Sequence, residues 1–357
     1  MKLPSGRHLQ SVLPAAALAC AVGLGHAAAR GDEIHVNGKT LQRVQVIGYA
    51  HGDVEIRTAT GEQDKFPLSD VEFIVLGSVT GVADFNQAEE LMVKREAGQA
   101  VERYERAVRA ARGFWASMAR VRLVMAADAA GDLEKAVRVW LDVVAEDPHT
   151  AAELVPQAPP SPRSQANERT QKRLEKALAE QSPGAAQAVT TLVYYDVLKR
   201  TGDPAAAVAG EQVADSPLPL EVMTARTVAV KLSALRAEID AQRTAAALKS
   251  LDTMIAVAPM EFLPDILILK AQALLATAQR EQEFLQAALP AMRVVIHFPN
   301  NPLVGEGLLL AGEAHARAGR QADAERLLQE CLRRGNAPER VLEQARSELA
   351  RMSAAGS

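Results

Sequence analysis

The side chains that most often carry catalysis or hold metal ions are few in this chain, and their spacing matches no reactive motif. The 357-residue chain contains seven histidines, which are His8, His26, His35, His51, His149, His297 and His315. None of them stands in an H-E-x-x-H zinc motif, and no C-x-x-C pair occurs. The sequence also lacks the G-x-S-x-G turn of acyl-transfer enzymes and the G-x-x-x-x-G-K-[ST] phosphate loop. We therefore expect no enzymatic activity, no bound metal and no cofactor.

The two cysteines indicate no disulfide chemistry either. Cys20 lies within an apolar N-terminal stretch that is expected to be removed, so Cys331 would stay alone in the processed chain. Cys331 falls on the apolar face of an expected helix, where we interpret it as a small buried hydrophobic residue. Residues 17–20 (ALAC) faintly resemble a bacterial lipobox, so a lipid anchor at Cys20 is the alternative to simple cleavage.

Residues 1–29 are typical of a secretory signal peptide. Lys2 and Arg7 make its start positive, and the apolar run at 12–24 is too short to span a bilayer. Three alanines at 27–29 supply an A-x-A cleavage site. No later stretch has the length and hydropathy of a transmembrane helix. We expect an exported protein, periplasmic or extracellular, without a transmembrane span.

The composition limits both the architecture and the partner. Apolar residues make up 48% of the chain but aromatic residues only 4%, so the core must be built from alanine, leucine and valine. This palette suits closely packed helices better than a deep, aromatic-lined pocket. The formal net charge is −4 and becomes more negative once the basic leader is removed. Such a charge argues against a nucleic-acid partner.

The residues that follow the leader, 30–80, are predicted to form a small all-β domain. Asn37-Gly38 and His51-Gly52 are turn signals between short apolar runs, and residues 54–58 alternate apolar with charged side chains. Five short strands on this scale resemble an SH3-like barrel.

From residue 81 onward the apolar pattern takes the period of a helix. A helix is expected between Gly131 and Pro148, and its apolar face carries small Ala136, large Trp140 and small-to-medium Val143. The same spacing returns at Ala247, Leu251, Met254 and Pro259. This pattern resembles the second helix of a tetratricopeptide repeat (TPR), and the resemblance covers roughly residues 82–337. It implies an α-solenoid whose first helices line a concave groove.

The predicted fold class is therefore mainly α, a TPR-like α-solenoid preceded by a small all-β, SH3-like barrel domain. The expected segments are a signal peptide (1–29), a small β-barrel domain (30–80), helical repeats (81–148), a Pro-rich insertion with a charged helix (149–183), further helical repeats (184–338) and a capping helix with a tail (339–357). Segment 149–183 is either a hinge between two sub-arrays or an insertion on one face, and the insertion is favoured.

The TPR resemblance implies that the groove binds an extended peptide or a helix of a partner protein. Helical register places seven residues along it, which are Phe85, Glu89, Met92, Met125, Asp128, Glu313 and Arg317. Phe85 and Met125 are apolar at helical spacing, so burial in the core is the competing interpretation. The predicted function is a non-catalytic protein–protein interaction scaffold of the bacterial cell envelope. The alternatives are a self-associating structural envelope protein and a regulatory subunit of an exported enzyme.

Overall fold

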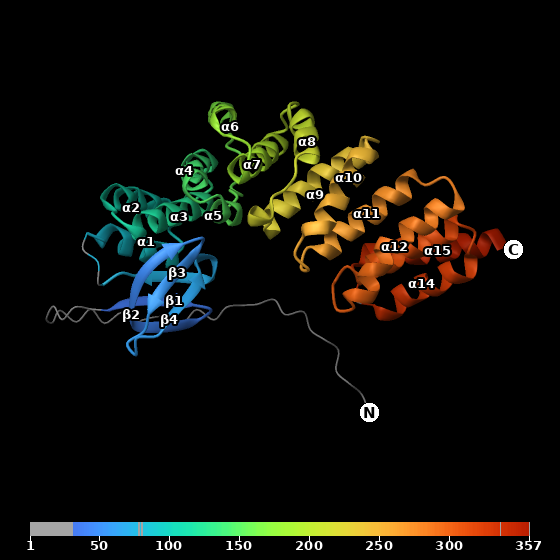
Figure 1. The fold of residues 1–357 in the computed structure, drawn as a ribbon, viewed down its shortest axis with the longest axis horizontal. Helices are drawn as coiled ribbons and strands as arrows, with labels where there is room; N and C mark the ends of the chain where they lie inside the picture. The colour runs from blue at the N-terminus through green and yellow to red at the C-terminus, as the bar shows by residue number, and fades with distance from the viewer. Residues whose placement is uncertain (1–30, 78, 80, 336, 357) are drawn as a thin grey trace.

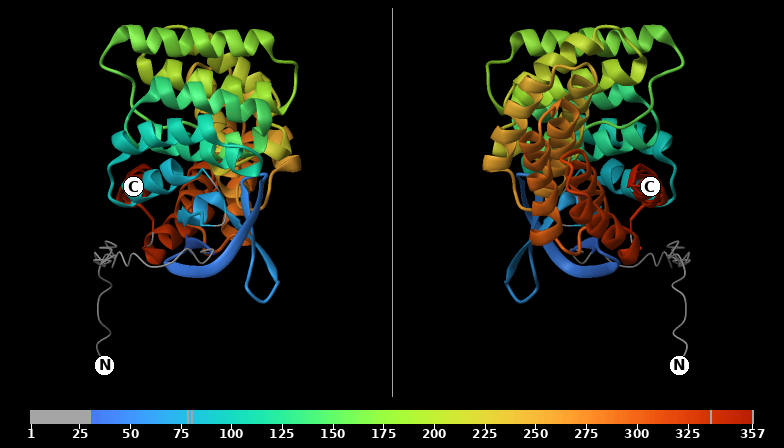
Figure 2. Two further views of the ribbon diagram at one scale, coloured as in Figure 1. Left: turned by 90° about the vertical axis from the view of Figure 1, so that its left-hand side faces the viewer. Right: turned by 90° about the vertical axis from the view of Figure 1, so that its right-hand side faces the viewer.

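The computed structural model of this protein describes residues 31–77, 79, 81–335 and 337–356. The predicted signal peptide and Cys20 lie outside these residues. The described chain is mainly helical, with a small antiparallel sheet at its N-terminal end. The helices follow one another along an arch, and the sheet lies on the inner side of the N-terminal limb (Figure 1). Seen from its ends, the arch shows the green and cyan helices of this limb nearly parallel, in successive layers (Figure 2).

Five strands and a short 3-10 helix make the β unit. They are β1 (Asp32–Val36), β2 (Lys39–Ala50), β3 (Asp53–Arg57), β4 (Gln63–Pro67), η1 (Leu68–Asp70) and β5 (Val71–Val75). The two predicted turns are present: Asn37, Gly38, His51 and Gly52 all have positive φ, which suits tight hairpins between twisted strands.

The strand order is β4-β3-β2-β1-β5, so β4 and β5 are the two edges and do not pair with each other. The sheet is open, and the predicted closed barrel is wrong. Helix α1 (Ala83–Val93) occupies the place where a closing strand would lie. The backbone N–H groups of Ile74 and Leu76 donate to the side chains of Glu89 and Asn86 at 2.8 and 2.9 Å. These side chains satisfy the edge of β5, which an exposed sheet would otherwise offer to another strand.

The remaining helices follow in chain order. They are α2 (Ala97–Ala110), α3 (Phe114–Ala129), α4 (Leu133–Glu146), α5 (Pro148–Glu153), α6 (Ser164–Glu180), α7 (Ala185–Thr201), α8 (Ala206–Asp215), α9 (Ala225–Asp240), α10 (Thr244–Val257), α11 (Leu263–Thr277), α12 (Glu281–His297), α13 (Val304–Arg317), α14 (Gln321–Arg334) and α15 (Glu339–Gly356). A 3-10 turn, η2 (Leu220–Val222), precedes α9. Most helices pack against the helices directly before and after them, as in an array of local units.

Helix α4 illustrates how the repeated sequence pattern forms the core. Asp132 caps its start by accepting from the N–H of Lys135 at 3.0 Å. Ala136 and Trp140 are fully buried, and the Trp140 Nε1–H donates to the carbonyl of Ala151 at 2.8 Å. Small and large side chains therefore interlock between neighbouring helices. A single apolar core runs from the sheet as far as α11.

Candidate functional site

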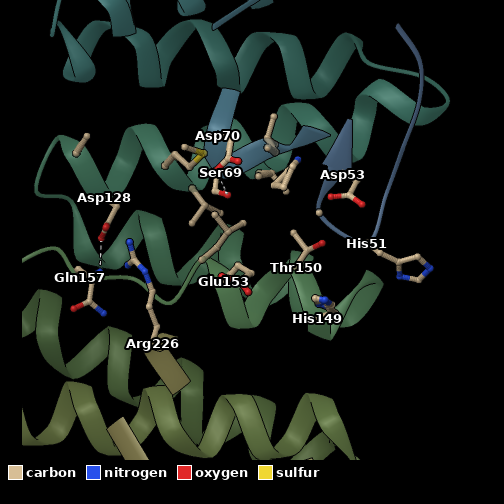
Figure 3. Close-up of a pocket in the computed structure, with 18 of the residues that line it drawn as sticks. His51, Asp53, Ser69, Asp70, Asp128, His149, Thr150, Glu153, Gln157 and Arg226 are labelled. Atoms are coloured by element: carbon tan, nitrogen blue, oxygen red, sulfur yellow. Dashed lines mark hydrogen bonds between the residues drawn. The ribbon is translucent and has the colours of Figure 1, made fainter. Parts of the chain in front are cut away.

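A cleft of about 790 Å³ opens where the sheet meets the helical arch. One wall comes from the β2–β3 turn and from the end of β4 with η1, and another from the C-terminal half of α3. Helix α5 and the chain that follows it close the cleft, and Arg226 reaches in from the start of α9. Figure 3 shows side chains from these segments arranged around one space. The site is thus built from five parts of the sequence that only the fold brings together.

The floor of this cleft is apolar. Val121, Val124 and Met125 lie on one face of α3, because residues three and four apart share a helix face. Val121 and Val124 are buried in the core below, and Met125 is half-buried. Leu154, just after α5, extends the apolar surface.

The Pro-rich segment at residues 154–160 forms a fixed wall. Asp128 Oδ1 accepts from the backbone N–H groups of both Gln157 and Ala158, each at 2.6 Å. Arg200 and Arg226 donate to backbone carbonyls of the same segment at 2.6 to 3.0 Å. Charged side chains therefore hold both the donors and the acceptors of a segment that has no regular hydrogen-bond ladder. This part of the Pro-rich stretch is a packed wall and not a free linker.

Three carboxylates stand around the cleft, on three different elements. Asp53 begins β3, Asp70 ends η1 and Glu153 ends α5 (Figure 3). Within the described residues, no hydrogen bond or ion pair joins the carboxylate of Asp53 or Glu153 to another side chain. Asp70 only accepts from the neighbouring Ser69 hydroxyl, at 3.4 Å. None of the three carboxylates therefore forms an ion pair within the described residues.

A second hollow of about 340 Å³ continues the cleft beyond Tyr49 and Thr150, which line both spaces. Its acids are engaged: Asp147 caps α5 and accepts from the Thr150 hydroxyl at 2.8 Å. Burial raises the pKa of Tyr49 to about 12, so its hydroxyl stays protonated at neutral pH. Tyr49 can therefore act as a hydrogen-bond donor in the wall between the two hollows.

Met125 and Asp128 are the two predicted groove residues that the structure brings together, and both line the cleft. Asp128 has a different role from the one predicted. Its Oδ1 accepts from two backbone N–H groups of the Pro-rich wall, so its carboxylate is already engaged within the chain.

Phe85 and Glu89 do not line an open groove, and the prediction that they do so is wrong. Their exposed fractions are 0% and 1%. The ring of Phe85 packs edge-on against Tyr104 of α2 and Trp115 of α3, and Glu89 lies between β5 and these helices. Glu89 accepts from the N–H of Ile74 at 2.8 Å and from the Tyr104 hydroxyl, and Arg122 Nε lies 3.2 Å from its Oε1. Burial raises the pKa of Glu89, and the Arg122 guanidinium opposes this shift. Glu89 thus fastens β5 to the helices.

The other three predicted residues lie elsewhere. Met92 packs, half-buried, against the core at the end of α1. Glu313 and Arg317 lie on α13, and neither reaches the cleft. Burial raises the pKa of Glu313, and the nearby charge of Glu348 on α15 adds to the shift. Glu348 of the C-terminal helix therefore lies near Glu313, whereas Arg317 is exposed.

The described residues offer little for catalysis or metal binding. No group of three or more His, Cys, Asp or Glu side chains among them could hold a metal ion. His51 lies at the cleft with its Nδ1 3.8 Å from Asp147 Oδ2, and it has no serine or cysteine partner among the described residues. Cys331 is fully buried, and burial raises the pKa of its thiol. None of the helices over the described part of the chain has the length and apolar character that a bilayer crossing requires.

Comparison with known proteins adds no relative: no protein-family model and no curated protein matches this chain. The function must therefore be argued from the site. Register on α3 identified part of the cleft, but it missed Asp53, Asp70, Glu153 and Arg226. These four residues sit on turns and helix ends, where charged side chains are ordinary, so their sequence context carries no local signal.

Proposed function

We propose that this protein is an exported, non-catalytic binding scaffold of the bacterial cell envelope that holds a segment of a partner protein in the cleft between its sheet and its helical arch. The TPR resemblance and the packing of successive helices support a solenoid that presents a concave binding surface. The leader-like residues 1–29 support export.

The observation that carries this proposal is a preformed cleft with an apolar floor and a fixed wall. Ordering a flexible loop on binding costs free energy, and a wall that is already held reduces this cost. Asp128, Arg200 and Arg226 hold the Pro-rich wall before any partner arrives. The cleft is also open, which suits a segment of a larger partner better than an enclosed small molecule.

Self-association is the second candidate, and one surface favours it. On α12, Leu285, Leu289, Met292 and Ile296 follow one another at steps of four, three and four residues, which forms one stripe along a helix. Leu289 and Ile296 are 63% and 64% exposed. A second copy of the chain could cover this stripe, although the stripe shows no charge pattern that would select a copy over another protein.

A site-specific photocrosslinker tests the proposal in the cells that make the protein. Gln157 is exposed at the cleft, and Glu102 on α2 is an exposed position away from it. We expect the crosslinker at Gln157, but not at Glu102, to capture one or two envelope proteins identified by mass spectrometry.

Two matched variants separate cleft binding from general contact. Ala129 is exposed and lines the cleft, whereas its neighbour Ala130 is exposed and does not line it. Ala129→Trp should abolish crosslinking from Gln157, and Ala130→Trp should leave it unchanged. Crosslinks from Gln157 only to a second copy of the chain would favour self-association. Equal crosslinking in both variants would overturn the cleft as the binding site.

A further inference from the structure

We infer that the segment bound in the cleft is basic: a short stretch of polypeptide that carries lysine or arginine side chains beside an apolar residue. This inference rests on the proposed function and adds the chemistry of the partner. It is based on the three carboxylates Asp53, Asp70 and Glu153, which line the cleft beside its apolar floor and form no ion pair with another described residue.

Acids elsewhere on this surface are commonly paired within the chain. Arg169 donates from Nε and Nη2 to both oxygens of Glu134 at 2.8 and 2.7 Å, and this contact lowers the pKa of Glu134. Lys65 on β4, next to β3, binds Glu55 at 2.6 Å; the charge of Asp53 also acts on Lys65, but no ion pair joins the two. Unpaired acids that converge on one hollow give it a negative potential, which the low-dielectric walls concentrate.

The basic groups at the cleft do not cancel this potential by direct pairing. Arg226 Nη1 donates to the carbonyl of Val155 at 2.9 Å, so its guanidinium is engaged in holding the wall. Asp128, in turn, uses one oxygen for two backbone N–H groups. Arg226 keeps its positive charge, but the lining carries four carboxylates (Asp53, Asp70, Asp128 and Glu153) against this one guanidinium, so its net charge is negative.

Asp53 and Asp70 come from the sheet wall and Glu153 comes from α5 (Figure 3). Met125 and Leu154 line the same cleft. Successive side chains of an extended peptide point to opposite sides. An extended segment can thus place an apolar side chain on the floor while its neighbours direct cations to the carboxylates. An acidic segment would meet like charges at each of these positions, which selects against it.

Three short peptides with blocked ends, identical in their apolar residues, serve as probes. Their other positions carry lysine, glutamine or glutamate. We expect the lysine peptide to bind the full-length processed protein in fluorescence anisotropy, to bind more weakly as salt is raised, and to outcompete the other two. Replacing all three acids together, in Asp53→Asn, Asp70→Asn and Glu153→Gln, should weaken its binding by about tenfold to a hundredfold, since an exposed ion pair contributes about twofold to fivefold.

A charge-matched control is available. Glu102, Asp142 and Glu343 are exposed helical acids outside the cleft, and no hydrogen bond or ion pair joins their carboxylates to another described residue. Glu102→Gln, Asp142→Asn and Glu343→Gln together change the net charge by the same amount and should leave affinity for the lysine peptide within about twofold. Equal weakening by both triple variants would overturn the inference, because it would show a general charge effect.

The inference and the proposed function can fail separately. One outcome is that Ala129→Trp blocks crosslinking from Gln157 while the triple change at Asp53, Asp70 and Glu153 leaves it unaffected. In that case the cleft binds a partner, but the positive charges of the partner do not select it, and the inference is wrong. Equal binding of the glutamine and lysine peptides would contradict the inference in the same way. If Ala129→Trp leaves lysine-peptide binding intact, the peptide binds outside the cleft and the inference fails as well.

Discussion

Replacing Arg122 by methionine should loosen the sheet from the helical arch in a pH-dependent way. Arg122 is 5% exposed; its Nε lies 3.2 Å from Glu89 Oε1, and its Nη2 donates to the carbonyl of Val71 at 3.0 Å. Methionine fills most of the same space but supplies neither the charge nor the donor. Glu89, at 1% exposure, would keep its contacts to Ile74 and Tyr104 without a cation.

The loss of stability in Arg122→Met depends on the ionisation state that the buried carboxyl of Glu89 adopts. It can stay ionised without its cation, or it can take up a proton, and protonation sets the upper limit. An ordinary glutamate has a pKa of about 4.3, so protonation costs about 4 kcal/mol at pH 7 and about 1 kcal/mol at pH 5. The lost hydrogen bond to Val71 adds about 1 kcal/mol that does not depend on pH.

The sign of the pH dependence follows from linkage. Loss of Arg122 raises the pKa of Glu89 beyond the increase that burial already causes. A carboxyl with a raised pKa in the folded state contributes stability at pH below its ordinary pKa and loses it as the pH rises. The deficit of Arg122→Met relative to the natural protein should therefore grow from pH 5 to pH 7.

Urea unfolding followed by tryptophan fluorescence measures this loss of stability in the N-terminal limb. The chain has two tryptophans, Trp115 and Trp140, and both lie in the N-terminal limb near the sheet. Adding Glu89→Gln to Arg122→Met should remove most of the pH dependence, because no titrating group then lies in the gap. A deficit that is equal at pH 5 and pH 7 would refute the assignment of this cost to the Glu89 charge.

Two further predictions concern the helical array. Trp140→Ala should destabilise the protein by about 3–5 kcal/mol, because it leaves a cavity and removes the hydrogen bond to Ala151. Urea midpoints measure this loss, and the more conservative Trp140→Phe should shift the midpoint less. Lys231 on α9 donates to the carbonyls of Val213, Ala214 and Ser216 at the end of α8, and burial lowers its pKa to about 8. The unfolded chain keeps this proton up to about pH 10.4, so the contribution of Lys231 to the free energy of unfolding should rise by up to about 3 kcal/mol between pH 8 and 10.4. Urea midpoints should show this rise in the natural protein and not in Lys231→Met. Parallel pH curves for the two proteins would contradict the prediction.

The helical part of the fold could be predicted because its signals are local. Cap, spacing and small–large alternation all lie within one helix, as Asp132, Ala136 and Trp140 show in α4. The hairpin turns at Asn37 and His51 could be found for the same reason, since a positive φ has a local sequence preference. Closure of the sheet depends instead on a contact with α1. The carboxylate of Glu89 takes a backbone donor of β5, and nothing in the strand sequence indicates that a helix will do this.

The cleft could be predicted only on the side that a helix provides. Register placed Met125 and Asp128 on the inner face of α3, and both line the cleft. The same reasoning was wrong for Phe85 and Glu89, because it assumed that the inner face of every first helix is free. The sheet, together with Tyr104 of α2 and Trp115 of α3, covers that face in α1, and the open surface that the cleft provides begins at α3.

Residues of the buried ion pair and its contacts are sequence neighbours of residues that line the cleft. The docking of the sheet is therefore linked to the proposed binding. Arg122 follows Val121 of the floor, and it holds Val71, which follows Asp70 of the rim. The position of this rim relative to α3 is therefore set by the same contact that fastens β5. A partner that touches both walls binds only the docked arrangement and stabilises it by mass action. Under the proposed function, the sheet would supply one wall of the binding site, and its attachment through Glu89 and Arg122 would hold that wall against α3.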